Sequence, residues 1–126
     1  MQYEEFITRV AESAGVSQDT AAALTRATLA TLAERISGGE ARDLAAQLPA
    51  RLQTPLMGAK EQAEKFSFEE FVARTQNRAG VDAHIAEVGV EAVLATLRDA
   101  VSPGEFDDVL SQLPAEFHGL GARRPR

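Results

Sequence analysis

The sequence predicts an all-α fold made by tandem duplication of a three-helix unit, with two pseudo-symmetric halves in one helical bundle. A shift of 65 residues aligns residues 3–52 with residues 68–117 without a gap, and about 21 of the 50 pairs are identical. Apolar residues recur at helical spacing in both copies. No segment shows the alternation of period two, bounded by turn residues, that indicates a β-strand.

The first helix of each repeat is expected over residues 3–14 and 68–79. Gly15 and Gly80 follow each helix at the place of a left-handed cap, a conformation that glycine adopts without steric cost. An apolar stripe at helical spacing marks the buried face, and its members are Tyr3, Phe6, Ile7 and Val10, then Phe68, Phe71 and Val72.

The second helix is the longest, over about residues 18–36 and 83–101, and it is expected to form the common core together with the first-helix phenylalanines. Its buried face is read from residues about four apart, namely Leu24, Thr28, Leu32 and Ile36, then Val90, Val93, Leu94, Leu97 and Val101. Leu24 in the first copy is replaced by Gly89 in the second, which indicates close packing of helices at this point.

The third helix is expected over about residues 38–48 and 103–113, and each copy stops before a proline. Both copies begin with the spacing of a capping box, in which a serine and a glutamate three residues later satisfy free backbone N–H groups at the helix start. The two segments are Ser37-Gly38-Gly39-Glu40 and Ser102-Pro103-Gly104-Glu105. Within them, the repeated Gly39 and Gly104 suggest close backbone packing.

These elements predict a single helical domain over residues 1–126. Its parts are repeat one (3–52), a linker (53–65), repeat two (66–117) and a flexible tail (118–126). Pro55 and Gly58 favour a turn in the linker, and residues 58–66 are an alternative candidate for a solvated helical extension.

Composition excludes several classes of protein. The hydrophobic share of 44% and the charged share of 25% are ordinary for a globular chain, and the absence of cysteine excludes disulfides and thiolate metal sites. No apolar run is long enough to span a membrane, and the acidic start does not match a signal peptide, so we expect a cytoplasmic protein without a membrane partner. Thirteen basic and nineteen acidic residues give a net charge of −6, and we expect no nucleic-acid partner. The arginines of the last four residues are interpreted as a solvated tail.

The segment SGGEARDLAAQLP, residues 37–49, and its altered copy in the second repeat carry a family resemblance. Together with the alanine- and leucine-rich second helix, they resemble the bacterial family catalogued as domain of unknown function 2267. This resemblance covers nearly the whole chain and implies an all-α, cytoplasmic bacterial protein. It implies no established activity, cofactor or catalytic residue.

Four repeated carboxylates are the candidates for chemistry: Glu40, Asp43, Glu105 and Asp108. Residues three apart share one helix face, so two such pairs meeting between the repeats would offer four oxygens to Mg²⁺, Mn²⁺ or Ca²⁺. The sequence favours the simpler interpretation that the glutamates complete the capping boxes and interact with the helix dipoles. No residue is therefore assigned to a metal, a cofactor or catalysis.

Two further polar residue types recur in both repeats. Arg9 and Arg74 each follow a glutamate by four residues, and a more specific hypothesis has them bridging to Asp43 and Asp108 on the third helices. Gln47 and Gln112 precede a Leu-Pro pair, where their amides are expected to bond the exposed backbone at that helix end.

The function favoured by the sequence is a non-enzymatic helical interaction module that binds a protein partner or a second copy of itself. The segment Pro55-Leu56-Met57 is a candidate apolar contact, although it would serve equally to cap the core. The alternative is a protein that binds a small anion or a divalent metal at the N-termini of the two third helices. No cofactor is expected.

Overall fold

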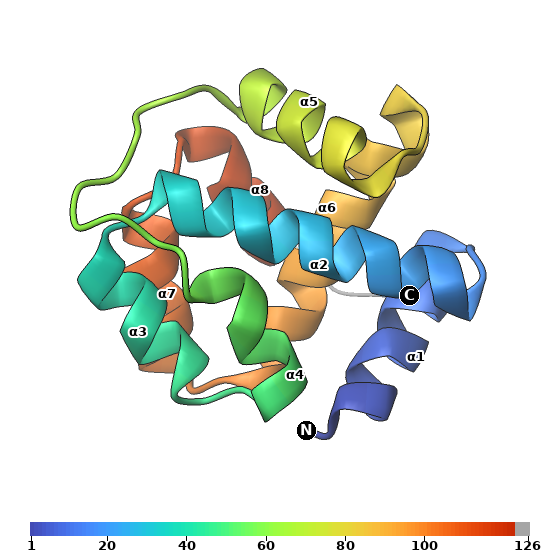
Figure 1. Cartoon of the computed structure of the whole chain (residues 1–126), viewed down its shortest axis with the longest axis horizontal. Coiled ribbons are helices and arrows are strands. Elements are labelled where there is room, and N and C mark those ends of the chain that lie inside the picture. Colours follow the sequence, from blue (N-terminus) through green and yellow to red (C-terminus); the bar gives the residue numbers. More distant parts are fainter. Residues whose placement is uncertain (123–126) are drawn as a thin grey trace.

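Helices make up most of the described chain. The computed structural model describes the backbone of residues 1–122 and the side chains of residues 1–119 (Figure 1). In chain order the elements are α1 (Tyr3–Ala14), α2 (Gln18–Arg35), α3 (Gly38–Ala45), α4 (Ala50–Gln53), the 3-10 turn η1 (Thr54–Leu56), α5 (Phe68–Ala79), α6 (Ala83–Ala100), α7 (Pro103–Ser111) and α8 (Ala115–Ala122). Residues 1–122 contain no strand, and the all-α prediction is confirmed.

The ends of the helices follow the expected caps. Gly15 and Gly80 adopt the left-handed conformation, with φ of 68° and 69°. Helix α3 ends three residues before the expected Leu48, because the chain tightens before the proline. There Leu48 N donates to Ala45 O at 3.0 Å, and Leu113 N donates to Leu110 O at the same distance after α7.

The linker contains no helix over residues 57–67, so the alternative of a helical extension over residues 58–66 is wrong. Backbone hydrogen bonds hold the linker to the bundle instead: Glu64 N donates to Glu34 O at 2.8 Å, and Gly38 N donates to Glu61 O at 3.3 Å. At the other end of the chain, α8 extends into the segment expected to be a flexible tail. Residues 123–126, with their three arginines, lie outside the described residues.

The first helix of each sequence repeat packs on the second helix of its own repeat and also on that of the other repeat. Helix α1 contacts α6, and α5 contacts α2, which also crosses α6 (Figure 1). Phe6 and Phe71 are fully buried in these contacts, as are the expected core residues Leu24, Leu32 and Ile36. The predicted core is confirmed, whereas the duplication stays an inference from the sequence identity.

Ion pairs follow the same exchange of partners. Arg9 on α1 lies 3.3 Å from Asp99 on α6, and Arg74 on α5 lies 3.1 Å from Glu34 on α2. Positions 34 and 99 are themselves 65 residues apart. Both arginines also make the expected pair with the glutamate four residues earlier. The hypothesis that they bridge to Asp43 and Asp108 on the third helices is therefore wrong.

Leu24 and Gly89, which occupy matching positions in the two repeats, face each other between α2 and α6. Both residues are buried, and a Cβ atom added at Gly89 would lie 2.5 Å from Leu24 Cδ2. Two large side chains at these positions would overlap, so the glycine makes room for the leucine. The close packing expected at Gly89 is confirmed. It is absent at Gly104, where an added Cβ meets nothing within 4 Å, and at Gly39, where the nearest atom is 3.8 Å away.

We expect Gly89→Ala to lower the free energy of unfolding by about 1–3 kcal/mol, because overpacking forces Leu24 or a helix to move. Denaturant unfolding measures this loss. The exposed Gly104→Ala is the matched control and should leave stability unchanged or slightly raised. In the double variant Leu24→Ala/Gly89→Ala the loss should be smaller than the sum of the single losses. Additive losses would contradict the contact.

Candidate functional site

Helices α3 and α7 lie side by side at one end of the bundle (Figure 1). Each begins at a serine whose side-chain oxygen accepts from the backbone three residues later. Ser37 Oγ accepts from Glu40 N at 3.2 Å, and Ser102 Oγ accepts from Glu105 N at 3.2 Å. The serine half of each expected capping box is therefore confirmed.

The glutamate half of each capping box is not made, because a glutamine from the other repeat takes its place. Ser37 N donates to Gln112 Oε1 at 2.7 Å, and Ser102 N donates to Gln47 Oε1 at 2.7 Å. Each glutamine also donates from its amide nitrogen to the hydroxyl oxygen of the same serine. The interpretation of Glu40 and Glu105 as capping-box partners is wrong.

Sequence reasoning placed the two glutamines at the ends of their own helices and missed this exchange. The signal available in the sequence was that the serine and the glutamine recur together, ten residues apart, in both copies. A polar pair repeated in this way is able to bond across the repeats as well as within one.

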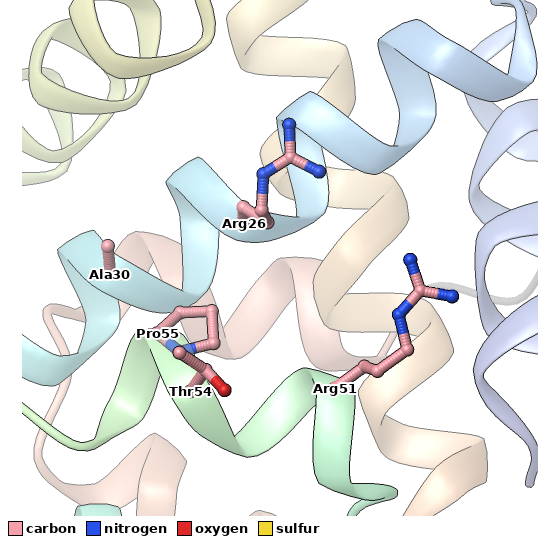
Figure 2. A pocket seen from close by; sticks show the side chains of 5 residues that line it. All are labelled: Arg26, Ala30, Arg51, Thr54 and Pro55. Atoms are coloured by element: carbon pink, nitrogen blue, oxygen red, sulfur yellow. The ribbon is translucent and has the colours of Figure 1, made fainter.

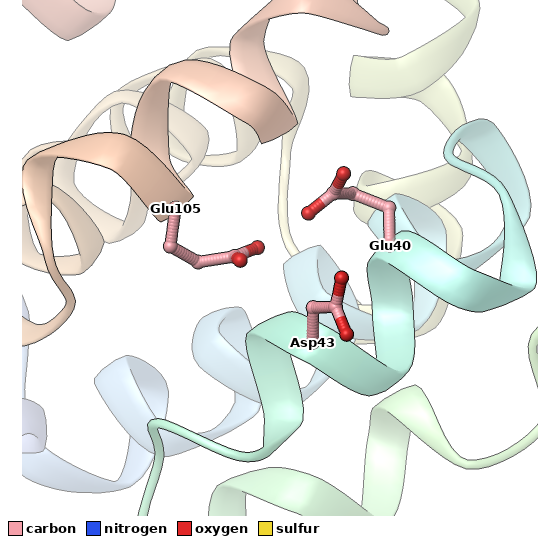
Figure 3. Close-up of side chains that lie close together, drawn as sticks. All are labelled: Glu40, Asp43 and Glu105. Carbon is pink, nitrogen blue, oxygen red and sulfur yellow. The ribbon is translucent and has the colours of Figure 1, made fainter.

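The displaced glutamates turn toward each other, and Asp43 joins them (Figure 3). One carboxylate oxygen from each of Glu40, Asp43 and Glu105 lies within 4.8 Å of the other two. Glu105 is 8% exposed, and the Oε2 atoms of Glu40 and Glu105 are buried without a hydrogen-bond partner. The structure thus brings together three of the four candidate carboxylates. Asp108 is exposed and lies outside this carboxylate cluster.

The cluster is electrostatically strained when all its members are ionised. Burial raises the pKa of Glu105 to about 8, and the neighbouring carboxyl group of Glu40 acts in the same direction. The negative charges of Glu40, Asp43 and Asp108 act in the same direction. Near neutral pH, a proton or a cation is therefore needed to stabilise the cluster.

The arrangement suits a cation and not an anion. Carboxylate oxygens are the ligands preferred by hard divalent cations, and oxygens on opposite sides of Ca²⁺ are about 4.6–5.2 Å apart, against about 4.0–4.2 Å for Mg²⁺. Separations of up to 4.8 Å therefore accommodate one shared ion. Three carboxylates between α3 and α7 would repel an anion, which argues against the anion alternative at this place.

A hollow beside α2 and an exposed apolar segment are the remaining candidate sites. Figure 2 shows an open hollow lined by Arg26 and Ala30 of α2 and by residues of α4 and η1, among them Arg51 and Thr54. Neither arginine has a carboxylate partner among the described residues, and the Arg51 guanidinium lies over the ring of Tyr3, 3.8 Å from its centroid.

The expected apolar contact segment divides between core and surface. Leu56 is buried against the core, whereas Met57 is 77% exposed. Leu56 thus has the core-capping role that the sequence left open.

These observations define the class of protein. It is an all-helical bundle with a carboxylate cluster where the two third helices, α3 and α7, meet. The profile of the family described as uncharacterized conserved protein (DUF2267) matches residues 3–120, and the chain belongs to this family. Comparison with curated proteins gave no match. Among the described residues, no helix has the length and apolar character needed to cross a membrane.

We expect Gln112→Ala to lower the free energy of unfolding by about 1–3 kcal/mol, because the partly buried Ser37 N loses its acceptor. The same change at Gln47 is the matched comparison. Its bond to Ser102 is exposed to water, so the loss should be smaller. Denaturant unfolding of both variants measures the difference, and equal losses would contradict this account of the caps.

In EDTA, the stability of the protein should fall as the pH rises from about 4.5 to about 8. The folded-state pKa of Glu105 lies above its unfolded value of 4.5, so the folded form binds more protons in this interval and loses that advantage on deprotonation. The slope from this group is at most about 1.4 kcal/mol per pH unit. Glu105→Gln should flatten the curve, whereas Asp107→Asn, an exposed neighbour, should not. A wild-type curve as flat as that of Glu105→Gln would refute the assignment.

Proposed function

We propose that this protein binds one divalent cation through Glu40, Asp43 and Glu105. The observation that carries the proposal is the buried, unpartnered Oε2 of Glu105, which lies beside two further carboxylates within 4.8 Å. Native proteins seldom leave a buried polar oxygen without a partner, and a cation would provide one for both glutamates.

Carboxylate oxygens within 4.8 Å of one another suit the hard divalent cations as a class, Ca²⁺, Mn²⁺ and Mg²⁺ among them. Asp43 is exposed, so water has access to the remaining coordination positions. Because Glu40 and Asp43 belong to α3 and Glu105 belongs to α7, a bound cation would link the third helices of the two repeats.

The other expectations from the sequence stay predictions. These are a non-enzymatic role, a protein partner or self-association, the absence of a nucleic-acid partner, a cytoplasmic location and a bacterial origin. Met57 is the large apolar side chain that the described surface exposes, and one such side chain offers a protein partner only a small apolar contact. Cation binding is the more specific proposal because three residues from two helices converge on one point.

Thermal unfolding in EDTA, then with Ca²⁺, Mn²⁺ or Mg²⁺, tests the proposal, with titration calorimetry to measure affinity. A cation at 100 times its dissociation constant should stabilise the folded protein by about 2.7 kcal/mol, which raises the Tm by several degrees. Glu105→Gln should fold, because its amide is uncharged like the protonated carboxyl group of Glu105 near neutral pH, and it should lose the shift. Asp107→Asn, on the same helix but outside the carboxylate cluster, should keep it.

The proposal fails if none of the three cations raises the Tm of the wild-type protein. It also fails if Glu105→Gln and Asp107→Asn show equal shifts, since the ions would then bind elsewhere.

A further inference from the structure

A second hollow lies beside the start of α3, between the end of α2, the linker and the end of α7. Its volume is about 460 Å³, within the range of small-molecule sites. Arg35, Ser37, Lys65 and Ser111 are among the residues that line it. None of these belongs to the carboxylate cluster.

Arg35 is a buried cation without an anionic partner. Arg35 as a whole is only 8% exposed. Its guanidinium donates to two neutral carbonyls, from Nε to Phe66 O at 2.9 Å and from Nη1 to Gln112 O at 2.7 Å. No described residue accepts from Nη2. That nitrogen is not fully buried, and Arg35 is one of the residues that line the hollow.

Burial holds the pKa of Arg35 below its usual value, yet an arginine keeps its charge at any physiological pH. A buried charge that meets only neutral dipoles is costly, and a bound anion would offset that cost.

The other groups around the hollow add positive potential. Lys65 is exposed and has no ion pair among the described residues. Glu61, the acidic residue of the lining, is neutralised by Arg42 at 3.1 Å. Ser37 begins α3 and places the positive end of that helix dipole at the hollow.

We propose that this hollow binds a phosphate monoester, with Arg35 Nη2 and Lys65 Nζ contacting the phosphate oxygens. Two cationic side chains match the charge of the dianion, and a guanidinium edge is well suited to phosphate oxygens. The hollow leaves room for a small organic group attached to the phosphate. This site is separate from the proposed cation site and does not depend on it.

The test is a titration of ¹⁵N-labelled protein with inorganic phosphate in EDTA, followed by NMR, against sodium chloride at equal ionic strength. Phosphate should shift the amide signals of Ser37, Gly39 and Lys65 in a saturable way, and chloride should not. Lys65→Gln should raise the apparent Kd about tenfold, which is the effect expected from losing a hydrogen bond to a charged group at the lower end of its usual strength. Lys60→Gln is the matched control, because Lys60 lies in the same linker but does not line the hollow, and it should leave the Kd unchanged.

Lys65 is the residue to change, because Arg35 also holds Phe66 and Gln112 in place and its loss would disturb the fold. Equal weakening by Lys65→Gln and Lys60→Gln would overturn the proposal. So would phosphate-dependent shifts confined to the arginine-lined hollow around Arg26 and Arg51, or no saturable shift at all. Glu105→Gln, which removes a proposed cation ligand, should leave the phosphate affinity unchanged.

Discussion

The two glutamine caps are the interaction on which the arrangement around α3 and α7 depends. A helix start needs acceptors for its free N–H groups, and a capping-box glutamate is the usual local source. Here Gln47 and Gln112 reach across to the capping serines of the opposite repeat and provide those acceptors. Glu40 and Glu105 are left without this task and meet, together with Asp43, in a partly buried cluster. The carboxylate cluster is thus a consequence of how the helices are capped.

The rest of the bundle shows the same exchange between repeats. Apolar contacts join α1 to α6 and α5 to α2, and ion pairs follow the same two routes, from Arg9 to Asp99 and from Arg74 to Glu34. Neither repeat buries its own first helix alone, so each depends on the other for its core. Leu24 and Gly89 occupy matching positions and face each other. A Cβ added at Gly89 would overlap Leu24, so the two copies differ at this point.

Much of the fold could be predicted from the sequence, because it is encoded locally. Serine caps, left-handed glycines and helical apolar stripes each involve residues a few positions apart, and α1 and α5 have the predicted bounds. Of the candidate site, the carboxylates could be found by their spacing. Their meeting depends on Gln47 and Gln112, whose bonds cross 55 and 75 residues, and local spacing does not encode a partner at that distance. For the same reason the sequence did not single out Arg35, since the two carbonyls that it bonds, Phe66 O and Gln112 O, lie 31 and 77 residues away.

The most direct measurement is anomalous diffraction from crystals of the protein soaked with Mn²⁺. We expect one strong anomalous peak between Glu40, Asp43 and Glu105, within about 2.0–2.6 Å of an oxygen from each, with Gln47 and Gln112 still bonded to Ser102 and Ser37. A structure with the glutamates folded back onto Ser37 N and Ser102 N, and no peak between the helices, would contradict it.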